Sequence, residues 1–164
     1  MAATVQIHEM TSNTEGGDKT SGTVRFKSAD ETTVDSTNRL QIPGSGEDFS
    51  YTKQLKAYIS VAPDTDLTNL EAYSDGASGF GTGVAVEYDT QQTFQSQTDA
   101  DIAGTDLFTK TAGAPIDMDA TNDTDGKTDT GYYGDILRLQ MVIQDTASPG
   151  TLTAETLTFS YDET

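Results

Sequence analysis

The sequence of 164 residues contains no cysteine, no tryptophan and only one histidine, His8. Without cysteine, the protein forms neither a disulfide framework nor a thiolate metal site. No G-x-S-x-G or H-E-x-x-H pattern is present, so His8 has no nucleophile or metal motif to serve. A carboxylate pair of the glycosidase kind can assemble from distant strands, but such sites usually also offer aromatic platforms, and tryptophan is missing. We therefore expect a protein without enzymatic activity.

Basic residues are also scarce. Nine Lys and Arg stand against 27 Asp and Glu, which gives a formal net charge of −18. The Lys and Arg are scattered singly, whereas DNA binding needs cationic side chains that displace the counterions of the phosphates. We expect no nucleic-acid partner. The acidity itself has two interpretations, which are general solubility and adaptation to a salty medium in which hydrated carboxylates keep a protein in solution.

Long apolar runs are absent as well. No segment approaches the roughly 18 apolar residues that span a membrane. The first ten residues, MAATVQIHEM, have neither the basic nor the apolar region of a secretory signal. We expect a soluble protein with no membrane partner, long enough for one domain with its own core.

What the sequence does contain is a two-residue period. In DILRLQMVIQD, Leu137, Leu139, Met141 and Ile143 alternate with other side chains, which is typical of a strand with one face in a core. The same pattern recurs at 53–61, 83–88 and 153–163. Weaker alternation predicts further short strands at 4–8, 22–28, 38–42, 69–73, 92–96 and 106–110.

About ten short strands separated by Gly, Pro, Asp and Asn indicate an all-β sandwich or barrel. The only interval with helical spacing is 64–73, where Leu67, Leu70 and Tyr73 could line one side of a turn. We interpret it as a turn that leads into a strand.

The first twenty residues differ in composition from the rest. The segment 11–20, TSNTEGGDKT, is polar and carries a Gly pair. It predicts a flexible hinge between an N-terminal strand or arm and a β-sandwich domain at 21–164. A detached arm can pair with the sheet edge of a neighbouring molecule. The alternative is an ordinary first strand followed by a loose loop.

One acidic stretch, DMDATNDTDGKTD at 117–129, has the composition of a calcium loop. If Gly126 takes position 6 of an EF-hand loop, positions 1 and 12 fall on Thr121 and Tyr133, so both anchoring carboxylates are missing. A looser Ca²⁺ site stays possible, and the alternative is a solvated loop in a chain that is acidic throughout. No other cofactor is expected. The candidate metal ligands are Asp117, Asp119, Asp123 and Asp125.

Two further stretches carry a family resemblance. In FSYTKQLKAYISVAPDTDLTNLEAYSDGASGFGTGVAV (49–86), a strand rich in aromatic and basic residues leads to a turn, then to NL, an aromatic residue and a DG loop. In LRLQMVIQDTASPGTLTAETLTFSYDET (137–164), a TASPG turn joins a hydrophobic strand to a terminal TLTF-x-YDE. Together they resemble small virion structural proteins of tailed bacteriophages, in which the second stretch is a closing hairpin. The chain departs from that pattern in its acidity and in lacking a tryptophan near YTKQLKAY.

The resemblance implies a jelly-roll-like antiparallel β-sandwich of about 8–10 strands and a structural role in a virion. The first role is a capsid decoration (cement) protein on the outer surface of the head. Its partners would be the major capsid protein and further copies of itself, with a homotrimer expected. The second role is a tail, neck or fibre component of the same kind of particle.

Contacts to the capsid or between copies are expected from the N-terminal arm and from aromatic side chains. The candidates are Val5, Ile7, Met10, Tyr73, Phe80, Tyr132 and Tyr133. A different class of protein, a carbohydrate-binding β-sandwich, would use Tyr58 and the same aromatic residues as platforms. The alternative for these aromatic residues is packing in the core or in a subunit interface.

Overall fold

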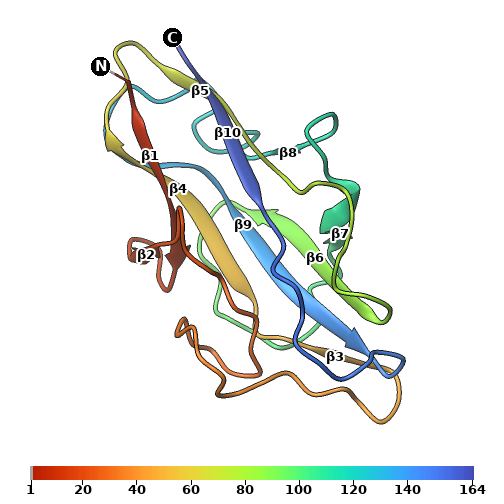
Figure 1. Ribbon diagram of the computed structural model, residues 1–164. Coiled ribbons are helices and arrows are strands. Elements are labelled where there is room, and N and C mark those ends of the chain that lie inside the picture. Colours follow the sequence, from red (N-terminus) through yellow and green to blue (C-terminus); the bar gives the residue numbers. More distant parts are fainter. Residues whose placement is uncertain (1) are drawn as a thin grey trace.

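The structure is a computed structural model that describes residues 2–164, and it is an antiparallel β-sandwich (Figure 1). Within these residues no helix is long and apolar enough to cross a membrane. The strands and the single 3₁₀ helix of residues 2–164 are β1 (Thr4–Met10), β2 (Gly16–Asp18), β3 (Glu47–Phe49), β4 (Lys53–Val61), β5 (Leu67–Tyr73), β6 (Val84–Gln91), β7 (Thr105–Asp106), η1 (Leu107–Thr109), β8 (Ile116–Asp117), β9 (Gly131–Gln144) and β10 (Thr158–Glu163).

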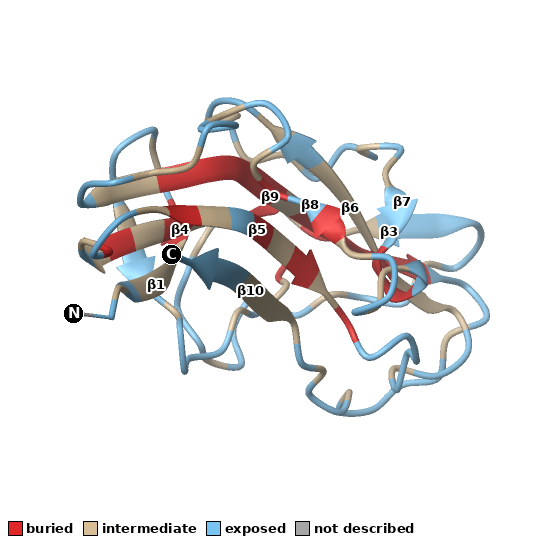
Figure 2. Ribbon diagram, turned by 90° about the horizontal axis from the view of Figure 1, so that it is seen from above, coloured by how far each residue is buried: buried red, intermediate tan, exposed pale blue. Residues whose placement is uncertain are grey.

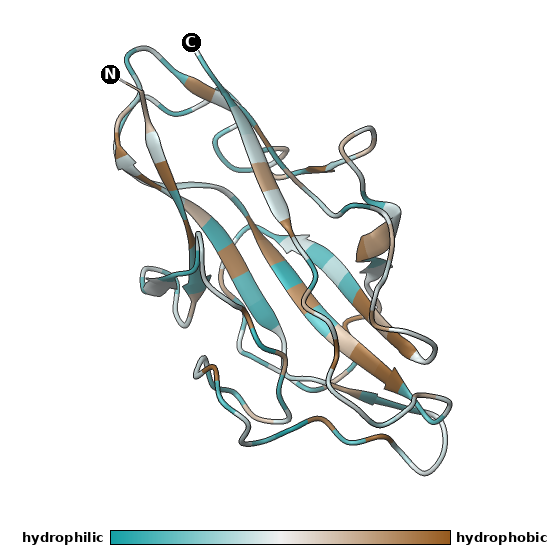
Figure 3. Cartoon of the chain, viewed as in Figure 1, coloured by the Kyte–Doolittle hydropathy of each residue, from teal (hydrophilic) through white to brown (hydrophobic). Residues whose placement is uncertain are grey.

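The larger layer, sheet A, has the order β2-β1-β4-β9-β6-β7, and β3 also pairs with β9. Strand β9 is its centre because β4 pairs along one edge and β6 and β3 pair with its second half. The register places Leu55 opposite Leu137 and Tyr88 opposite Leu139, so apolar side chains of neighbouring strands share one face. Figure 3 shows the resulting alternation of apolar and polar residues along β4 and β9.

The smaller layer, sheet B, has the order β10-β5-β8. It covers only part of the inner face of sheet A, and the buried segments of β4, β5 and β9 gather between the layers (Figure 2). The predicted core residues Leu137, Leu139, Met141 and Ile143 all belong to this core, which confirms the two-residue period of β9. The interval 64–73 also forms the expected turn and strand, because Leu67–Tyr73 is β5.

Residues 4–18 belong to sheet A in this chain. Strand β1 pairs with β4 from Thr4 opposite Val61 to Glu9 opposite Leu55, and on its other side it pairs with β2. The backbone N–H of Lys19 donates to the carbonyl of Ile7 at 2.7 Å. Residues 4–18 are thus a β-hairpin at the edge of sheet A, and residue 1 lies outside the described part.

The expected closing hairpin at the C-terminus is wrong. Strand β10 pairs with β5 in sheet B, while β9 lies in sheet A. Both edges of β9 are already occupied by β4, β6 and β3, so no edge is free for β10. The segment 145–157, which contains the TASPG turn, therefore crosses from one sheet to the other (Figure 1).

Four of the weaker strand predictions are also wrong. Residues 107–109 form the 3₁₀ helix, whose N-cap Asp106 accepts a hydrogen bond from the N–H of Phe108 at 2.9 Å. The segments 22–28 and 38–42 have no ladder partner, and 92–96 has none either. Alternation in a sequence indicates which side chains face inward, but a strand also needs a free sheet edge to pair with.

The outer face of sheet A is covered by the segment 92–104. Gln140 accepts a hydrogen bond from the N–H of Ile102 at 3.0 Å and donates to the carbonyls of Ala100 at 3.0 Å and Ser50 at 2.8 Å. Gln54 accepts from the N–H of Gln95 at 2.9 Å and donates to its carbonyl at 2.6 Å. Both glutamines are fully buried, so their carboxamides replace the backbone partners that this segment lacks.

Candidate functional site

The acidic segment 117–129 is attached to the sandwich by its own carboxylates. Asp119 accepts hydrogen bonds from the hydroxyl of Tyr133 at 2.6 Å and from the N–H of Leu70 at 3.2 Å. Asp123 accepts from the N–H of Gly134 at 2.9 Å. These aspartates therefore connect the loop to β5 and β9, which is a structural task.

Gly134 is the residue that makes the second of these contacts possible. Its φ is +73°, and a Cβ at this position would lie 2.4 Å from the carbonyl oxygen of Met118. Only glycine fits there, since the left-handed conformation and the close approach both exclude a side chain. The loop consequently packs directly against the backbone of β9.

The four candidate metal ligands do not form one coordination shell. In residues 2–164, no three carboxylate or histidine side chains lie close enough together to hold a metal ion. Asp119 and Asp123 bond different elements, Asp117 accepts from the N–H of Asp119 at 3.2 Å, and Asp125 is exposed. The nearby Lys127 forms an ion pair with Asp129 at 3.0 Å.

Two groups near this loop have raised pKa values. Burial raises the pKa of Tyr133 far above its ordinary value, and the hydrogen bond to Asp119 adds to this effect. Burial also raises the pKa of Asp117, and the neighbouring carboxyl of Asp119 contributes in the same direction. The neutral phenol of Tyr133 is the form that the fold requires, because it donates to a carboxylate.

The three candidate contact residues of the N-terminal arm lie within sheet A. Met10 is fully buried, and Val5 and Ile7 are partly buried against the core. In the isolated chain these side chains therefore stabilise the sandwich itself. Their proposed role in capsid contact stays a prediction.

The candidate aromatic residues are distributed over four places. Tyr133 lies in the core, fully buried. Phe80 packs edge-on against Phe108 with ring centroids 5.7 Å apart, and Tyr73 is half-buried on β5. Only Tyr58 and Tyr132 lie together, so the five aromatic residues do not form a single platform.

Tyr58 and Tyr132 form a half-buried cluster with His8, which we call the aromatic patch. The ring of His8 stacks on Tyr58 at 4.8 Å between centroids, and Tyr132 meets both rings edge-on at 5.1 and 5.7 Å. His8 lies within 3.3 Å of the Tyr132 hydroxyl and within 3.2 Å of the side-chain oxygen of Gln6. The three rings are fixed mainly by one another.

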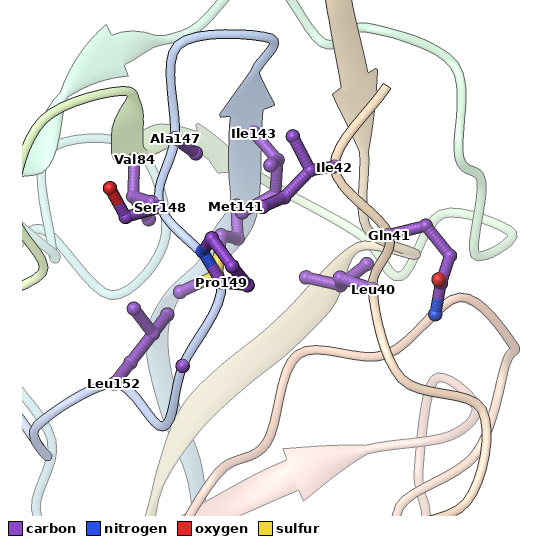
Figure 4. Close-up of a pocket in the computed structure, with 11 residues that line it drawn as sticks. Leu40, Gln41, Ile42, Val84, Met141, Ile143, Ala147, Ser148, Pro149 and Leu152 are labelled. Carbon is purple, nitrogen blue, oxygen red and sulfur yellow. The ribbon is translucent and has the colours of Figure 1, made fainter. Parts of the chain in front are cut away.

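An apolar groove lies over the part of the inner face of sheet A that sheet B does not reach. Its walls are the segments 19–27, 35–40 and 150–159, and its volume is about 860 Å³. A smaller hollow of about 350 Å³ continues it, in which Leu40 and Ile42 face Met141, Ile143, Pro149 and Leu152 (Figure 4). Leu40, Met141 and Leu152 line both spaces.

Cationic side chains gather at this groove. Four of the nine Lys and Arg of the sequence line it, against only two of the 27 acidic residues, Asp35 and Glu155. The lining thus has a formal charge of +2, in a protein of −18. The four cationic residues are Lys19, Arg25, Lys27 and Arg39.

The four cations differ in how far their charge is neutralised. Lys27 is buried and forms ion pairs with Glu31 and Asp35, both at 2.6 Å. In residues 2–164, Arg25 and Arg39 form no ion pair and donate only to backbone carbonyls. Their positive charge remains available to an anionic group from outside.

The second wall is held in place by the glycine-rich loop GFGTG. The N–H of Gly79 donates to a carboxylate oxygen of Glu155 at 2.8 Å. Gly83 has a φ of +76°, and a Cβ on it would lie 2.5 Å from the backbone nitrogen of Ala147. The TASPG turn and the segment that follows it are therefore positioned even though they belong to no sheet.

Sequence reasoning did not single out the groove as a site. The signal was present in TVRFK and NRLQI, where basic residues stand between apolar ones. Both segments were read as ordinary strands. Comparison of the chain with protein-family models, with curated proteins and with solved structures finds no match.

Proposed function

We propose that this chain is a non-enzymatic structural protein of a tailed-virus particle, and specifically a decoration protein on the outer surface of the head. In this role it binds the major capsid protein and associates with further copies of itself, with a trimer expected. The stretches that resemble such proteins, at 49–86 and 137–164, support the proposal. The jelly-roll connectivity that the resemblance implies belongs to the same proposal.

The observation that carries the proposal is the groove over the inner face of sheet A, which only segments outside any sheet cover. The groove is lined by half-buried apolar side chains, among them Val24, Phe26, Leu40 and Leu152, and grooves of this kind are used for protein association. The groove is bordered by the exposed Ile42, while Val61 and Tyr161 are exposed elsewhere on the sandwich. A protein with this surface is suited to being covered by a neighbour in an assembly.

The proposed work of the protein is mechanical. Each copy would spread contacts over several capsid subunits, so that surface buried at many interfaces opposes the outward pressure of packaged DNA. Stabilisation by binding follows mass action, and many weak contacts add when they act together. The acidic exterior would keep decorated particles apart in solution.

The location of the protein in purified particles tests this proposal. Antibody labelling seen by electron microscopy is expected to decorate the head uniformly. Labelling at one vertex or along the tail would instead support the tail, neck or fibre role. Particles that carry no label would refute a virion role altogether.

The aromatic patch favours a second candidate function, which is carbohydrate binding. Tyr58, Tyr132 and His8 lie together on the outer face of sheet A, and sugar rings stack on such side chains. A glycan array distinguishes the two functions. Binding that is lost in Tyr58→Ala would support the carbohydrate module, and an array without signal would leave the decoration role.

A further inference from the structure

The groove has the features of an unoccupied strand position. One wall, residues 150–157, leads directly into β10, the edge strand of sheet B. Within residues 2–164, the backbone groups of 23–26 and of 150–156 form no hydrogen bond, and none joins the two walls. The backbone of both walls is therefore free to pair with a polypeptide placed between them.

The walls also have the sequence pattern of strands. In 22–28 and 38–42, apolar and polar side chains alternate, and Val24, Phe26 and Leu40 face the groove. On the other wall Leu152 and Leu157 face it. Neither wall belongs to a ladder, but on the first wall Val24 and Phe26 are half-buried while Thr23 and Arg25 are exposed, as in a strand. What the walls lack is a pairing partner.

The floor of the groove is apolar. It consists of inward-facing side chains of sheet A, among them Leu55, Val86, Leu139 and Met141. A strand inserted above this floor would bury its alternate apolar side chains there, and its backbone would bond the walls. This is the mode of recognition known as β-strand addition.

The charge of the groove selects an acidic occupant. Arg25 and Arg39 carry positive charge that no carboxylate of the described residues neutralises. Outside the groove lining, the chain has five basic and 25 acidic residues (9 − 4 and 27 − 2), so the rest of the protein is strongly acidic taken as a whole. Two copies repel each other over most of their surfaces, and the groove is where this repulsion is offset.

We propose that an extended segment of a second copy of this chain occupies the groove as an added strand of sheet B. A second copy of this chain is itself an acidic polypeptide, and it is available wherever the protein is present. A contact between the groove of one copy and a different surface of the next is heterologous, and heterologous contacts form a ring when the rotation between copies closes and an open filament when it does not. The inference concerns how copies associate, and it holds or fails independently of where the protein sits in a particle.

A proline substitution tests the backbone pairing directly. Thr153→Pro removes an N–H that has no partner within residues 2–164, so no hydrogen bond of a single copy is lost, and circular dichroism checks that the variant is folded. The matched control is Thr153→Val, which keeps the N–H. In sedimentation equilibrium, the wild type and Thr153→Val are expected to self-associate alike. Thr153→Pro should raise the dissociation constant by about tenfold, since one or two hydrogen bonds are lost per contact.

A charge substitution tests the apolar floor and rim. Leu40→Glu places a carboxylate among apolar side chains of the groove and is expected to abolish association. Val34→Glu is the matched control, because Val34 is 49 % exposed and does not line the groove. Circular dichroism of each variant shows whether it is folded. If Leu40→Glu does not fold, Thr153→Pro decides alone.

Cross-linking identifies the occupant. A photoreactive benzoylphenylalanine at position 152 is expected to join to a peptide of a second copy, read by mass spectrometry of a mixture of ¹⁵N-labelled and unlabelled protein. A wild type that stays monomeric at all concentrations overturns the inference. So does association that neither Thr153→Pro nor Leu40→Glu weakens, and so do cross-links confined to one copy or made to a different protein.

Discussion

The two ends of the inner face of sheet A are covered in different ways. At the first, which we call the strand-covered end, β5 and β8 lie over Tyr133, and Leu70 and Met118 are fully buried between the sheets. At the second, the groove end, Met141 and Leu139 face the unpaired segments 23–42 and 147–157. Strand β9 runs through both ends, and apolar side chains face the core along it at each end.

The difference between the ends lies in hydrogen bonding and not in apolar character. At the strand-covered end, the covering backbone is paired within sheet B and to the acidic loop. At the groove end, the covering segments contribute side chains but no ladder. In the association that we propose, a polypeptide from another copy supplies backbone partners to these segments.

The largest effect is expected from cavities made at the strand-covered end. Leu70→Ala removes a fully buried side chain and should lower the free energy of unfolding by about 2–5 kcal/mol. Leu152→Ala is the matched change at the groove end, where the side chain is half-exposed, and it should cost less than about 1 kcal/mol in the monomer. Urea unfolding measures both. Equal losses would show that the two ends are packed alike.

The next effect concerns the outer face behind the groove end. Gln140→Leu leaves the N–H of Ile102 and the carbonyls of Ala100 and Ser50 without their partner, and should cost about 2–3 kcal/mol. Gln144→Leu is the control, since that side chain is exposed, and a change within about 0.5 kcal/mol is expected. A Gln140→Leu protein as stable as the control would mean that water replaces these bonds without loss.

A smaller effect is expected where the acidic loop meets the strand-covered end. Tyr133→Phe removes the hydrogen bond to the carboxylate of Asp119 and should cost about 1.5 kcal/mol at neutral pH.

The pH dependence of this effect follows from the raised pKa of Tyr133. A group with a raised pKa in the folded state contributes stability that is complete below its unfolded pKa, which is about 10 for tyrosine, and that is lost as pH rises above it. The wild type should therefore lose stability above about pH 10 more steeply than Tyr133→Phe. Parallel pH profiles in urea unfolding would contradict the assignment.

A local effect is expected at the wall of the groove. The hydrogen bonds from Lys27 lower the pKa values of Glu31 and Asp35. Their contribution is present above the unfolded pKa of about 4 and is lost as pH falls below it. Amide exchange of Ser28, corrected for its intrinsic rate, should accelerate below that pH in the wild type. In Lys27→Met it should be fast at every pH, while exchange in β9 serves as the reference.

The smallest effect is expected from calcium. Because Asp119 and Asp123 bond β5 and β9 and no three carboxylates converge, Ca²⁺ should shift the melting temperature no more than Mg²⁺ at equal ionic strength. A specific shift with Ca²⁺, lost in Asp123→Asn, would restore the looser calcium site that the sequence left open.

Much of the fold was predictable from the sequence because burial imposes a period of two on a strand. That period correctly marked β9 and β4, and it resolved the ambiguous 64–73 as a strand. It failed at 92–96, where Gln95 is bonded by the side chain of Gln54 and not by a neighbouring strand. Alternation indicates which side chains face inward. A coil segment that packs against a sheet also directs its apolar side chains inward, so the pattern does not distinguish it from a strand.

The candidate sites were less predictable, because each depends on segments far apart in the chain. The cluster of aspartates is visible in the sequence, but its bonds to Leu70 and Gly134 are not. Arg25, Arg39 and Leu152 looked unrelated until the fold placed them around one groove.

The sequence by itself determined an all-β protein without cysteine chemistry, with a net charge of −18 and with inward-facing positions along its main strands. These properties depend on composition and on the period of two, which are local. Only the tertiary structure decided which strands find partners. The edges of β9 are filled by β4, β6 and β3, so the chain after Gln144 must cross to the other sheet, and two strand-like segments remain unpaired beside an apolar floor.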